Sequence, residues 1–393
     1  MNTPKIRFKG FEDDWEQRKL GDVFKEYSEK HHEELPALTI VQGGGTIFRE
    51  ESDRSLQYDK SNLSGYKMVK KDDFIVHLRS FEGGLEKANS DGIISPAYHT
   101  MHGDNVDSRF YYPYFRSYDF INRKLVAHVY GIRDGRSIDI DGMKSIEIPY
   151  TSYEEQKTIG DYLDSLDHLI TLHQRKCDET KQLKKFMLQK MFPKNGEKNP
   201  KIRFEGFTDD WEQRKLGEVV GIYDGVHQTP QYQDSGIMFL SVENITTLKS
   251  EKYISEEAFE RDYKVYPEKG DILMTRIGDV GTTNVVQTKE KVAFYVSLAL
   301  LKPKEINSYF LSNAMKTSVF QKGLRERTLV TAIPQKINKD EIGRVNVFIT
   351  NNAEEQKKIG DYFTALDHLI TLHQRKCEKL KELKKYMLHN MFV

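Results

Sequence analysis

The sequence predicts an α+β protein, with two mixed α/β domains joined by two long antiparallel coiled-coil helices and a pseudo-twofold relation between the halves. Three observations lead to this prediction. A short opening motif occurs twice, a long helical segment occurs twice, and the stretches between them are rich in short strands. The length of 393 residues agrees with two or three domains. We predict a first domain at 1–151, a first spacer helix at 152–193, a second domain at 194–351 and a second spacer helix at 352–393.

The opening motif is nearly identical in its two copies. Residues 4–21 return at 200–217, and both tryptophans of the chain, Trp15 and Trp211, lie inside these copies. An internal repeat is the first feature to interpret because it decides the architecture. The two copies differ only at Lys9/Glu205 and Glu12/Thr208.

The helical repeat is longer. Residues 154–192 return at 354–392, and within them Leu166–Cys177 recurs unchanged as Leu366–Cys377. The stretches 22–150 and 218–350 share no obvious run, so a solenoid with a period of about 20–50 residues is excluded. We call the two repeats together the constant frame. Near-identity beside complete divergence indicates that this frame carries two interchangeable cassettes.

Each helical copy begins with a capping signal. Ser152 is the expected N-cap with Glu155 closing a capping box, and Asn352 with Glu355 takes the same place in the second copy. Each helix should span about 37 residues, or roughly 55 Å. A heptad-like seam of steps of three and four follows. Its members are Ile159, Leu163, Leu166, Ile170, His173, Cys177, Thr180, Leu183, Met187 and Met191, and then Ile359, Phe363, Leu366, Ile370, Cys377, Leu380, Leu383, Met387 and Met391.

The two helices are expected to pair with each other. Each is too long for one small domain, and each needs a partner for its apolar seam. Chain order then favours antiparallel packing, with the C-terminus returning toward the N-terminus. The histidines and cysteines on the seam are expected to be packed core residues rather than metal ligands or redox centres.

The variable stretches are expected to be α+β domains with a curved sheet. Short β-rich runs occur between Gly, Asp and Asn turn signals. Helices are expected near 110–125 and 308–325. The predicted strands are Phe74–Leu78, Ile272–Thr275, Val292–Val296 and Arg344–Ile349.

Composition and motifs exclude several classes of function. Lys and Arg (60) balance Asp and Glu (60), so no global positive field indicates a polyanionic partner. No His/Cys spacing resembles a zinc site, and no apolar run suffices for a membrane span. The start lacks an apolar signal core, so we expect a cytoplasmic protein with no membrane contact. Gly43–Gly45 lacks the rest of a P-loop, and no other catalytic signature occurs, so we expect no enzyme activity and no metal.

Several polar, aromatic-flanked loops carry side chains that suit DNA. Arginine can bond guanine bidentately, glutamine and asparagine can bond adenine, and glycines let the backbone approach phosphates. For each single residue, an ordinary surface side chain is an equally open reading. The candidates are Arg79, Ser80, Phe81, Arg133 and Arg136 in the first domain, and His227, Gln228, Thr229, Arg276, Thr282, Thr283, Arg325, Arg327, Lys336 and Asn338 in the second.

The sequence resembles the specificity subunits of Type I restriction–modification systems over nearly its whole length. The repeated openings and the repeated helices carry most of the resemblance. Further landmarks occur in both variable domains, and those of the first suggest a different domain subtype. The matching motifs are Trp15–Gly21 and Trp211–Gly217, Leu166–Lys176 and Leu366–Lys376, Val296–Leu300 and Ile333–Lys339, and Ser80–Glu86 and Ile94–Tyr98.

The resemblance implies a function and a set of partners. Each variable domain would be a target-recognition domain that reads one half of a bipartite, asymmetric target in double-stranded DNA. Two methyltransferase (modification) subunits would dock on the constant helices and methylate adenine, and two ATP-driven restriction/translocase subunits would cut. S-adenosylmethionine, ATP and Mg²⁺ would bind those partners and not this chain. Partner subunits around the duplex would also explain the neutral charge.

Two other classes of function stay open at this point. A protein scaffold could also use divergent cassettes on a constant frame, and binding to random duplex DNA would discriminate against it. A self-contained nuclease or methyltransferase would show activity as a purified chain with Mg²⁺ or S-adenosylmethionine.

Overall fold

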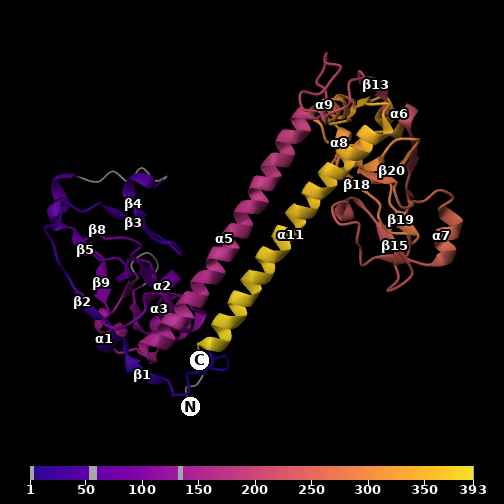
Figure 1. Cartoon of the computed structure of the whole chain (residues 1–393). Helices are drawn as coiled ribbons and strands as arrows, with labels where there is room; N and C mark the ends of the chain where they lie inside the picture. Colours follow the sequence, from indigo (N-terminus) through magenta and orange to yellow (C-terminus); the bar gives the residue numbers. More distant parts are fainter. Residues whose placement is uncertain (1–3, 53–59, 132–135, 393) are drawn as a thin grey trace. The chain divides into compact units, whose positions relative to one another are not determined.

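The computed structural model describes residues 4–52, 60–131 and 136–392 (Figure 1). The chain forms two compact units. The first contains Met1–His173 together with Arg375–Val393, and the second contains Gln174–Gln374. Each unit therefore combines one mixed α/β domain with part of each long helix. The predicted α+β class is confirmed.

The first domain is built on an antiparallel sheet in the order β2-β9-β6-β7. Smaller antiparallel pairs, β3–β4, β5–β8 and β10–β11, surround it, and β1 pairs with β12. The strands are β1 (Glu16–Lys19), β2 (Lys25–Tyr27), β3 (Leu38–Val41), β4 (Gly45–Phe48), β5 (Lys67–Val69), β6 (Phe74–Val76), β7 (Glu86–Lys87), β8 (Gly92–Ile94), β9 (His99–His102), β10 (Val129–Tyr130), β11 (Ser137–Ile138) and β12 (Glu147–Tyr150). The helices are α1 (Leu20–Val23), η1 (Arg49–Glu51), η2 (Lys60–Gly65), α2 (Ser80–Gly83), α3 (Ser108–Phe115), η3 (Phe120–Lys124), η4 (Leu125–His128) and α4 (Ile140–Lys144).

The second domain repeats this plan with a sheet in the order β14-β20-β17-β18. A further sheet, β16-β15-β19, contains a parallel pair between β15 and β19, and β13 pairs with β21. The strands are β13 (Glu212–Lys215), β14 (Val220–Asp224), β15 (Ile237–Leu240), β16 (Tyr253–Ile254), β17 (Ile272–Thr275), β18 (Thr283–Val285), β19 (Val292–Phe294), β20 (Leu298–Pro303) and β21 (Asn346–Ile349). The helices are α6 (Leu216–Val219), η6 (Val242–Asn244), α7 (Glu256–Asp262), α8 (Ser308–Met315), α9 (Ser318–Arg327) and α10 (Lys339–Gly343).

The four predicted strands and the two predicted helical regions are present. Residues 110–125 fall in α3, η3 and the start of η4, and residues 308–325 fall in α8 and α9. Alternation along β17 explains why the sheet is apolar on both faces. Ile272 and Met274 join the core that contains the long helices, whereas Leu273 joins a separate core on the other face.

Aromatic clusters join each domain to the long helices. Trp15 lies edge-on to Phe110 with 5.4 Å between ring centroids, and Phe392, just beyond the last helix, lies 5.0 Å from Phe110. The second unit repeats the cluster with Trp211, Phe310 and Phe192. Such aromatic pairs add to the stabilisation from buried area. Both tryptophans of the opening motif are therefore core anchors.

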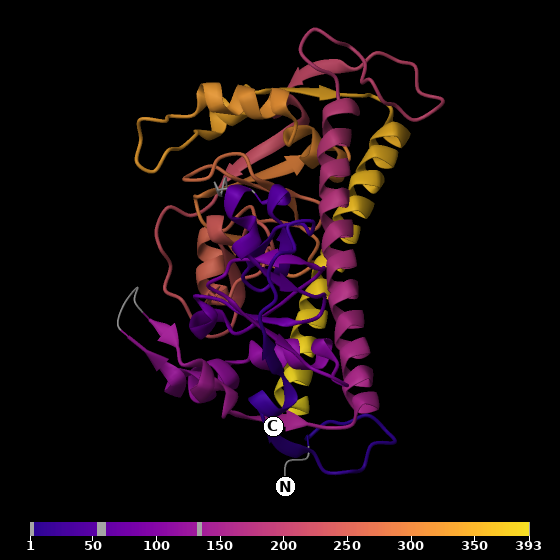
Figure 2. The same ribbon diagram turned by 90° about the vertical axis from the view of Figure 1, so that its left-hand side faces the viewer.

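The long helices are α5 (Tyr153–Lys190) and α11 (Ala353–Met391), and they lie side by side (Figures 1 and 2). Their pairing is antiparallel within each unit. In the second unit the Cys177 thiol is 4.0 Å from the Ile370 carbonyl oxygen, and Lys184 bonds Asp367 at 2.5 Å. The first unit repeats both contacts, with Cys377 against Ile170 and Lys384 against Asp167. The predicted antiparallel pairing and the buried, packed cysteines are confirmed.

Two details of the helix prediction are wrong. Ser152 accepts a hydrogen bond from the Glu155 amide at 3.4 Å, but the Glu155 carboxylate turns toward the opening motif and closes no capping box. Leu183 and Leu383, expected on the seam, are exposed. A straight α-helix drifts about 20° per heptad away from a 3.5-residue repeat, and the neighbouring Lys184 and Lys384 face the partner helix instead.

Candidate nucleic-acid interface

A buried carboxylate at the start of α5 holds the opening motif of the first unit. Arg7 donates to both carboxylate oxygens of Glu155, at 2.6 and 2.8 Å, and the Trp15 indole donates at 3.0 Å. The Thr151 hydroxyl bonds the same group. Burial raises the pKa of Glu155, but these bonds and the charge of Arg7 outweigh it, so the net pKa lies below the ordinary value.

The second unit repeats this set of contacts around a buried glutamate, which we call the carboxylate lock. Arg203 donates to Glu355 at 2.6 and 3.0 Å, and Thr350 donates at 2.6 Å. The Trp211 indole nitrogen is buried without a hydrogen-bond partner, unlike that of Trp15. The repeated Arg, Trp and Glu thus explain why the opening motif and the helix start occur as a matched pair in each half.

The glutamine that follows this glutamate holds the next helix of the domain. Gln156 accepts a bond from the Asp107 amide at 3.0 Å, and Gln356 accepts one from the Asn307 amide at 2.8 Å. Gly160 lets this helix come close, because a Cβ there would lie 3.1 Å from Arg109 and Asp107 atoms. The start of each long helix therefore holds both the opening motif that leads into the domain's first strand and the start of a domain helix, α3 or α8.

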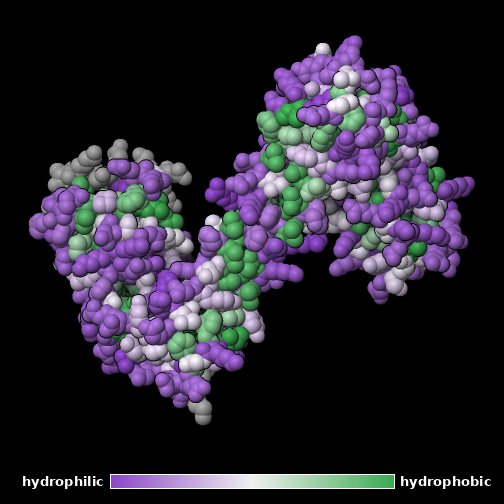
Figure 3. Space-filling model, in the orientation of Figure 1, coloured by the Kyte–Doolittle hydropathy of each residue, from purple (hydrophilic) through white to green (hydrophobic). Residues whose placement is uncertain are grey.

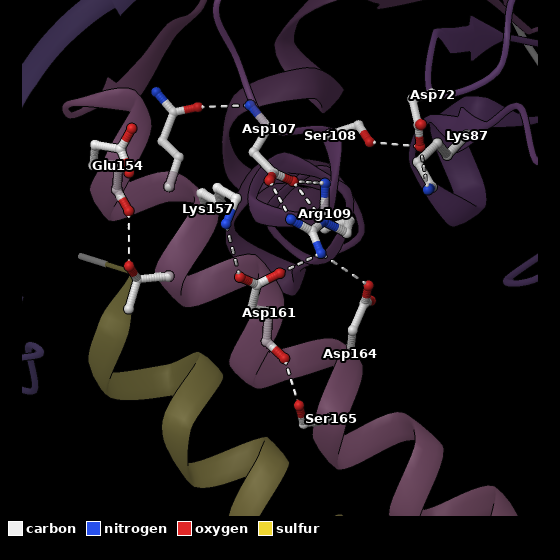
Figure 4. Close-up of polar contacts among 12 residues, drawn as sticks. Asp72, Lys87, Asp107, Ser108, Arg109, Glu154, Lys157, Asp161, Asp164 and Ser165 are labelled. Carbon is white, nitrogen blue, oxygen red and sulfur yellow. Dashed lines mark hydrogen bonds and ion pairs between the residues drawn. The ribbon is translucent and has the colours of Figure 1, made fainter.

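The first domain adds an ion-pair cluster of its own at this contact (Figure 4). Arg109 donates to Asp107 and Asp161 at 2.6 Å each and lies 3.5 Å from Asp164. The Asp107 and Asp161 carboxylates raise the pKa of Arg109. The second domain has Tyr309 at the corresponding place. The Arg109 ion pairs therefore differ between the two halves, whereas the contacts of Glu155 and Gln156 recur at Glu355 and Gln356.

Three of the predicted DNA-binding residues of the first domain lie close together. The Arg136 guanidinium lies over the Phe81 ring, 4.5 Å from its centroid, and reaches Glu82 at 3.3 Å. Arg79 also reaches Glu82, at 4.0 Å. These contacts join α2 to the start of β11. A surface that combines two arginines with an aromatic ring suits a phosphate or a base edge.

The other two candidates of the first domain have different outcomes. Ser80 is fully buried, and its hydroxyl accepts from the His77 amide at 2.9 Å. A buried side chain cannot reach a base edge, so a structural role replaces the prediction at Ser80. Arg133 lies outside the described residues.

A second buried carboxylate, which the sequence does not reveal, holds the Gly43–Gly45 turn of the first domain. Glu86 accepts bonds from the amides of Gly43 and Gly45 at 2.7 and 3.0 Å and from the Tyr112 hydroxyl at 2.7 Å. Arg116 is its ion-pair partner. Burial, with Glu86, raises the pKa of Tyr112. The Gly43–Gly45 turn is therefore held by a carboxylate, which agrees with its exclusion as a P-loop.

Arg276 is the centre of the second domain's loops. It is only 7% exposed, forms an ion pair with Asp224, and donates to the Ile337 carbonyl at 3.1 Å. Asp224 ends β14 and Ile337 precedes α10, so one guanidinium ties three loops together. This burial does not fit the DNA contact predicted for Arg276 and makes it a positioning residue for loops that are exposed.

Of the remaining candidates of the second domain, Arg325 and Arg327 lie in the last turn of α9, and most of the others lie on those loops. Thr283 begins β18 and is buried, with its hydroxyl 3.0 Å from that of Ser312. Thr282 is half-buried and bonds Thr275 across the turn, and Arg327 reaches Glu341 at 3.8 Å. The exposed side chains are His227, Gln228, Thr229, Arg325, Lys336 and Asn338.

Comparison with known proteins decides the family. The Type I restriction modification DNA specificity domain matches the chain twice, over residues 12–182 and 208–382. The chain belongs to this family. Specificity subunits are the non-catalytic DNA-recognition subunits of Type I systems, so the two matched regions are DNA-recognition regions.

Individual relatives are more distant. The Type I restriction enzyme MjaVIII specificity subunit of Methanocaldococcus jannaschii is 23% identical over 267 residues, which is 64% of this chain and 62% of that protein. The putative MjaX specificity subunit of the same organism is 22% identical over 271 residues, 64% of this chain and 60% of that protein. The matches therefore span less than two thirds of these relatives.

Solved structures support the fold. The S subunit of a Type I restriction-modification system from M. genitalium gives a TM-score of 0.63 at 17% identity and covers 100% of this chain and 99% of that chain. A chain from a study of complex assembly and conformational transition of the Type I system gives 0.51 at 19% identity, covering 96% and 97%. These likenesses show the fold alone, since the identities are low.

Both units of this specificity subunit expose apolar side chains on the long helices. In the first unit they include Leu169, Leu383 and Tyr386, and in the second Leu369, Leu183 and Phe186. In Figure 3 green patches lie along the helices. The two sets are equivalent positions of the repeat, and exposed apolar patches of this kind mark contact surfaces.

Among the described residues, the specificity subunit shows no cluster of metal ligands, and no described helix is long and apolar enough to cross a membrane. A cleft of about 800 Å³ lies between α3, α5 and the end of α11. Its cations already have partners, since Arg109 bonds Asp161, Arg116 bonds Glu86 and Lys384 bonds Asp167. These three cations of the cleft are therefore already engaged by carboxylates of the first unit.

Proposed function

We propose that this specificity subunit reads a bipartite, asymmetric target in double-stranded DNA, one half by each domain. One observation carries the proposal. The frame grips both domains through the same contacts, Glu155 and Gln156 in one unit and Glu355 and Gln356 in the other. The exposed candidate side chains nevertheless differ, with Arg79 and Arg136 on the first domain and His227, Gln228 and Thr229 among those on the second. Two domains that are held by equivalent contacts but expose different side chains suit a target whose halves differ.

The proposal assigns the reading surfaces as follows. In the first domain it is the Arg79, Phe81 and Arg136 cluster. In the second it is the set of loops that Arg276 and Asp224 hold together. Phosphate contacts from arginine and lysine would set the register, and polar side chains on the same loops would contact base edges. We further place the protein in the cytoplasm, where it has access to DNA.

Partner subunits would supply the chemistry. We propose that two methyltransferase subunits dock on the exposed apolar faces of the long helices and methylate adenine. The two equivalent faces support a pair of identical partners. Two restriction/translocase subunits would then cut in an ATP-dependent reaction. S-adenosylmethionine, ATP and Mg²⁺ would all bind the partners and not this chain.

The helices would also set the spacing of the two half-targets. Helix α5 has 38 residues, which corresponds to about 57 Å. Half-targets on the order of 10 bp apart, centre to centre, would fit a spacer of this size. Inserting four residues into α5 and four into α11, about one turn each, should lengthen the gap between half-targets and leave their bases unchanged. Sequencing the methylated sites measures this gap, and an unchanged gap would contradict the role of the helices as a spacer.

Gel shift with the purified chain tests the binding proposal. The chain, with and without its methyltransferase subunit, is titrated against random duplex and single-stranded DNA. We expect duplex binding that strengthens with the partner and weakens with salt. Replacing Arg325 and Lys336 by alanine should weaken binding and reduce the slope of log K against log salt by about 2.

Lys269 provides the matched control for these variants. It is exposed like the other two, but it lies before β17, whereas Arg276, which holds the reading loops together, follows the other end of that strand. Lys269→Ala should bind like the unmodified chain. Absence of any duplex binding, with the methyltransferase subunit stably bound, would contradict the proposal and favour a protein scaffold.

A further inference from the structure

The loop between α9 and α10 projects from the second domain (Figure 2, the orange loop beyond α9). It carries exposed apolar side chains. Ile333 is 100% exposed, Val330 is 69% exposed and Leu329 is 46% exposed. Burying such an aliphatic side chain is favourable because its apolar surface is removed from water. A loop that leaves three of them in water has given up this stabilisation, and exposed apolar groups gathered in this way indicate a contact surface.

The loop is held rigidly from its base. The Leu329 amide bonds the Lys336 carbonyl at 2.8 Å, and the Gly278 amide bonds the Gln335 carbonyl at 2.8 Å. The Gln335 side chain returns a bond to the Gly278 carbonyl at 2.9 Å, and Ile337 is completely buried. An apolar tip on a rigid base loses little conformational entropy on binding.

The surroundings of the tip favour DNA over protein as the occupant. Exposed Arg325 and Lys336 flank it along the chain, and neither forms an ion pair with a described residue. Cores of protein–protein interfaces are depleted of charge, whereas proteins that deform DNA combine cations for phosphates with apolar wedges that enter between base pairs. The exposed apolar faces of the helices differ from this tip, since they lie on long regular helices rather than on a projecting loop.

We propose that Val330 and Ile333, with Leu329 at the base of the loop behind them, form an apolar wedge that enters the duplex at one base step of the half-target read by the second domain. This inference rests on the proposed function. The wedge would partly unstack that step, while Arg325 and Lys336 contact the phosphates beside it. Sequence preference at the step would then reflect how easily it unstacks, without a hydrogen bond to either base pair.

Fluorescence of 2-aminopurine tests the wedge. Target duplexes carrying the probe at successive positions of each half-target are bound to the complex of the full chain with its methyltransferase subunit. The methylated adenine itself is left unprobed, because its extrusion would also raise the signal. We expect a several-fold increase at one further step in the second domain's half-target. Ile333→Ala should abolish this increase and weaken binding by about tenfold.

Thr331→Ala is the control within the same loop, because it leaves the apolar tip intact and should keep the signal. A mismatch at the wedge step should strengthen binding by the unmodified complex, because unstacking then costs less, and should not affect Ile333→Ala. If the complex binds the duplex but no probed step shows the fluorescence increase, the wedge proposal is wrong, while the proposed function is unaffected. Loss of the methyltransferase subunit from Ile333→Ala on size-exclusion chromatography would also overturn it, by making the loop a protein contact. No duplex binding at all would instead remove the proposed function.

Discussion

Replacing Glu155 by alanine is expected to lower the free energy of unfolding of the first unit by about 3 kcal/mol or more. The substitution leaves Arg7 largely buried without its ion-pair partner and removes the acceptor of the Trp15 indole. Breaking a buried ion pair from one side typically costs about 3–5 kcal/mol, because the remaining charge stays desolvated. It also releases the opening motif from the start of α5.

Urea unfolding followed by tryptophan fluorescence measures this effect. A Trp211→Phe background leaves Trp15 as the only indole, so the signal reports the first unit alone. Glu154→Ala is the matched control, since Glu154 is the exposed neighbour on the same helix turn and should change stability by less than about 0.5 kcal/mol. Equal effects of the two substitutions would show that the carboxylate does not hold the opening motif.

The same carboxylate gives the first unit an acid-sensitive contribution. The net pKa of Glu155 is lowered in the folded state, so its stabilisation is fully present above the pKa of an unfolded glutamate, about 4.3. It is lost as the pH falls through the lower folded value. Glu155→Gln should therefore flatten the decline in stability below about pH 4.3. A decline as steep as that of the unmodified chain would assign the acid sensitivity to other groups.

Exchanging residues 22–150 for the corresponding stretch of another specificity subunit is expected to change one half of the target completely and leave the other half unchanged. The reading cluster of Arg79, Phe81 and Arg136 lies within the exchanged stretch. The residues that grip it, Arg7 and Glu155, lie outside it. The incoming domain would need an aromatic side chain in the place of Phe110, to meet Trp15 and Phe392.

Sequencing of the methylated sites shows which bases of each half-target change after the exchange. Exchanging residues 154–192 with 354–392 within the chain is the control, because these segments are nearly identical and both half-targets should be retained. A change in both halves after the exchange of 22–150 would show that the domains do not read independently.

The architecture could be predicted because repeated segments of the sequence correspond to repeated parts of the fold. Two copies of one motif, two heptad-like seams and the connection order were enough for two domains on an antiparallel helix pair. Helix starts were within reach because Ser152 and Asn352 are strong caps, and both cap in the structure. The strand order in the two domains could not be matched, since no run of sequence is shared between β6 and β17.

The errors concern side chains with more than one possible partner. The spacing of Glu155 fits a capping box. In the structure its carboxylate instead binds Arg7, which lies 148 positions away along the chain. Its recurrence at Glu355, together with Arg7 and Arg203, was the signal that could have revealed the lock. The sequence favours Arg276 as a DNA contact because arginines in loops often bind DNA. Only the fold brings Asp224 and Ile337 to its guanidinium.

A genome-wide map of N6-methyladenine tests the recognition function most directly. Cells that carry the chain and its methyltransferase partner are compared with cells lacking only the chain. We expect a gapped, asymmetric motif that disappears when the chain is absent. An unchanged map, with the partner expressed and bound to the chain, would contradict its role in selecting the target.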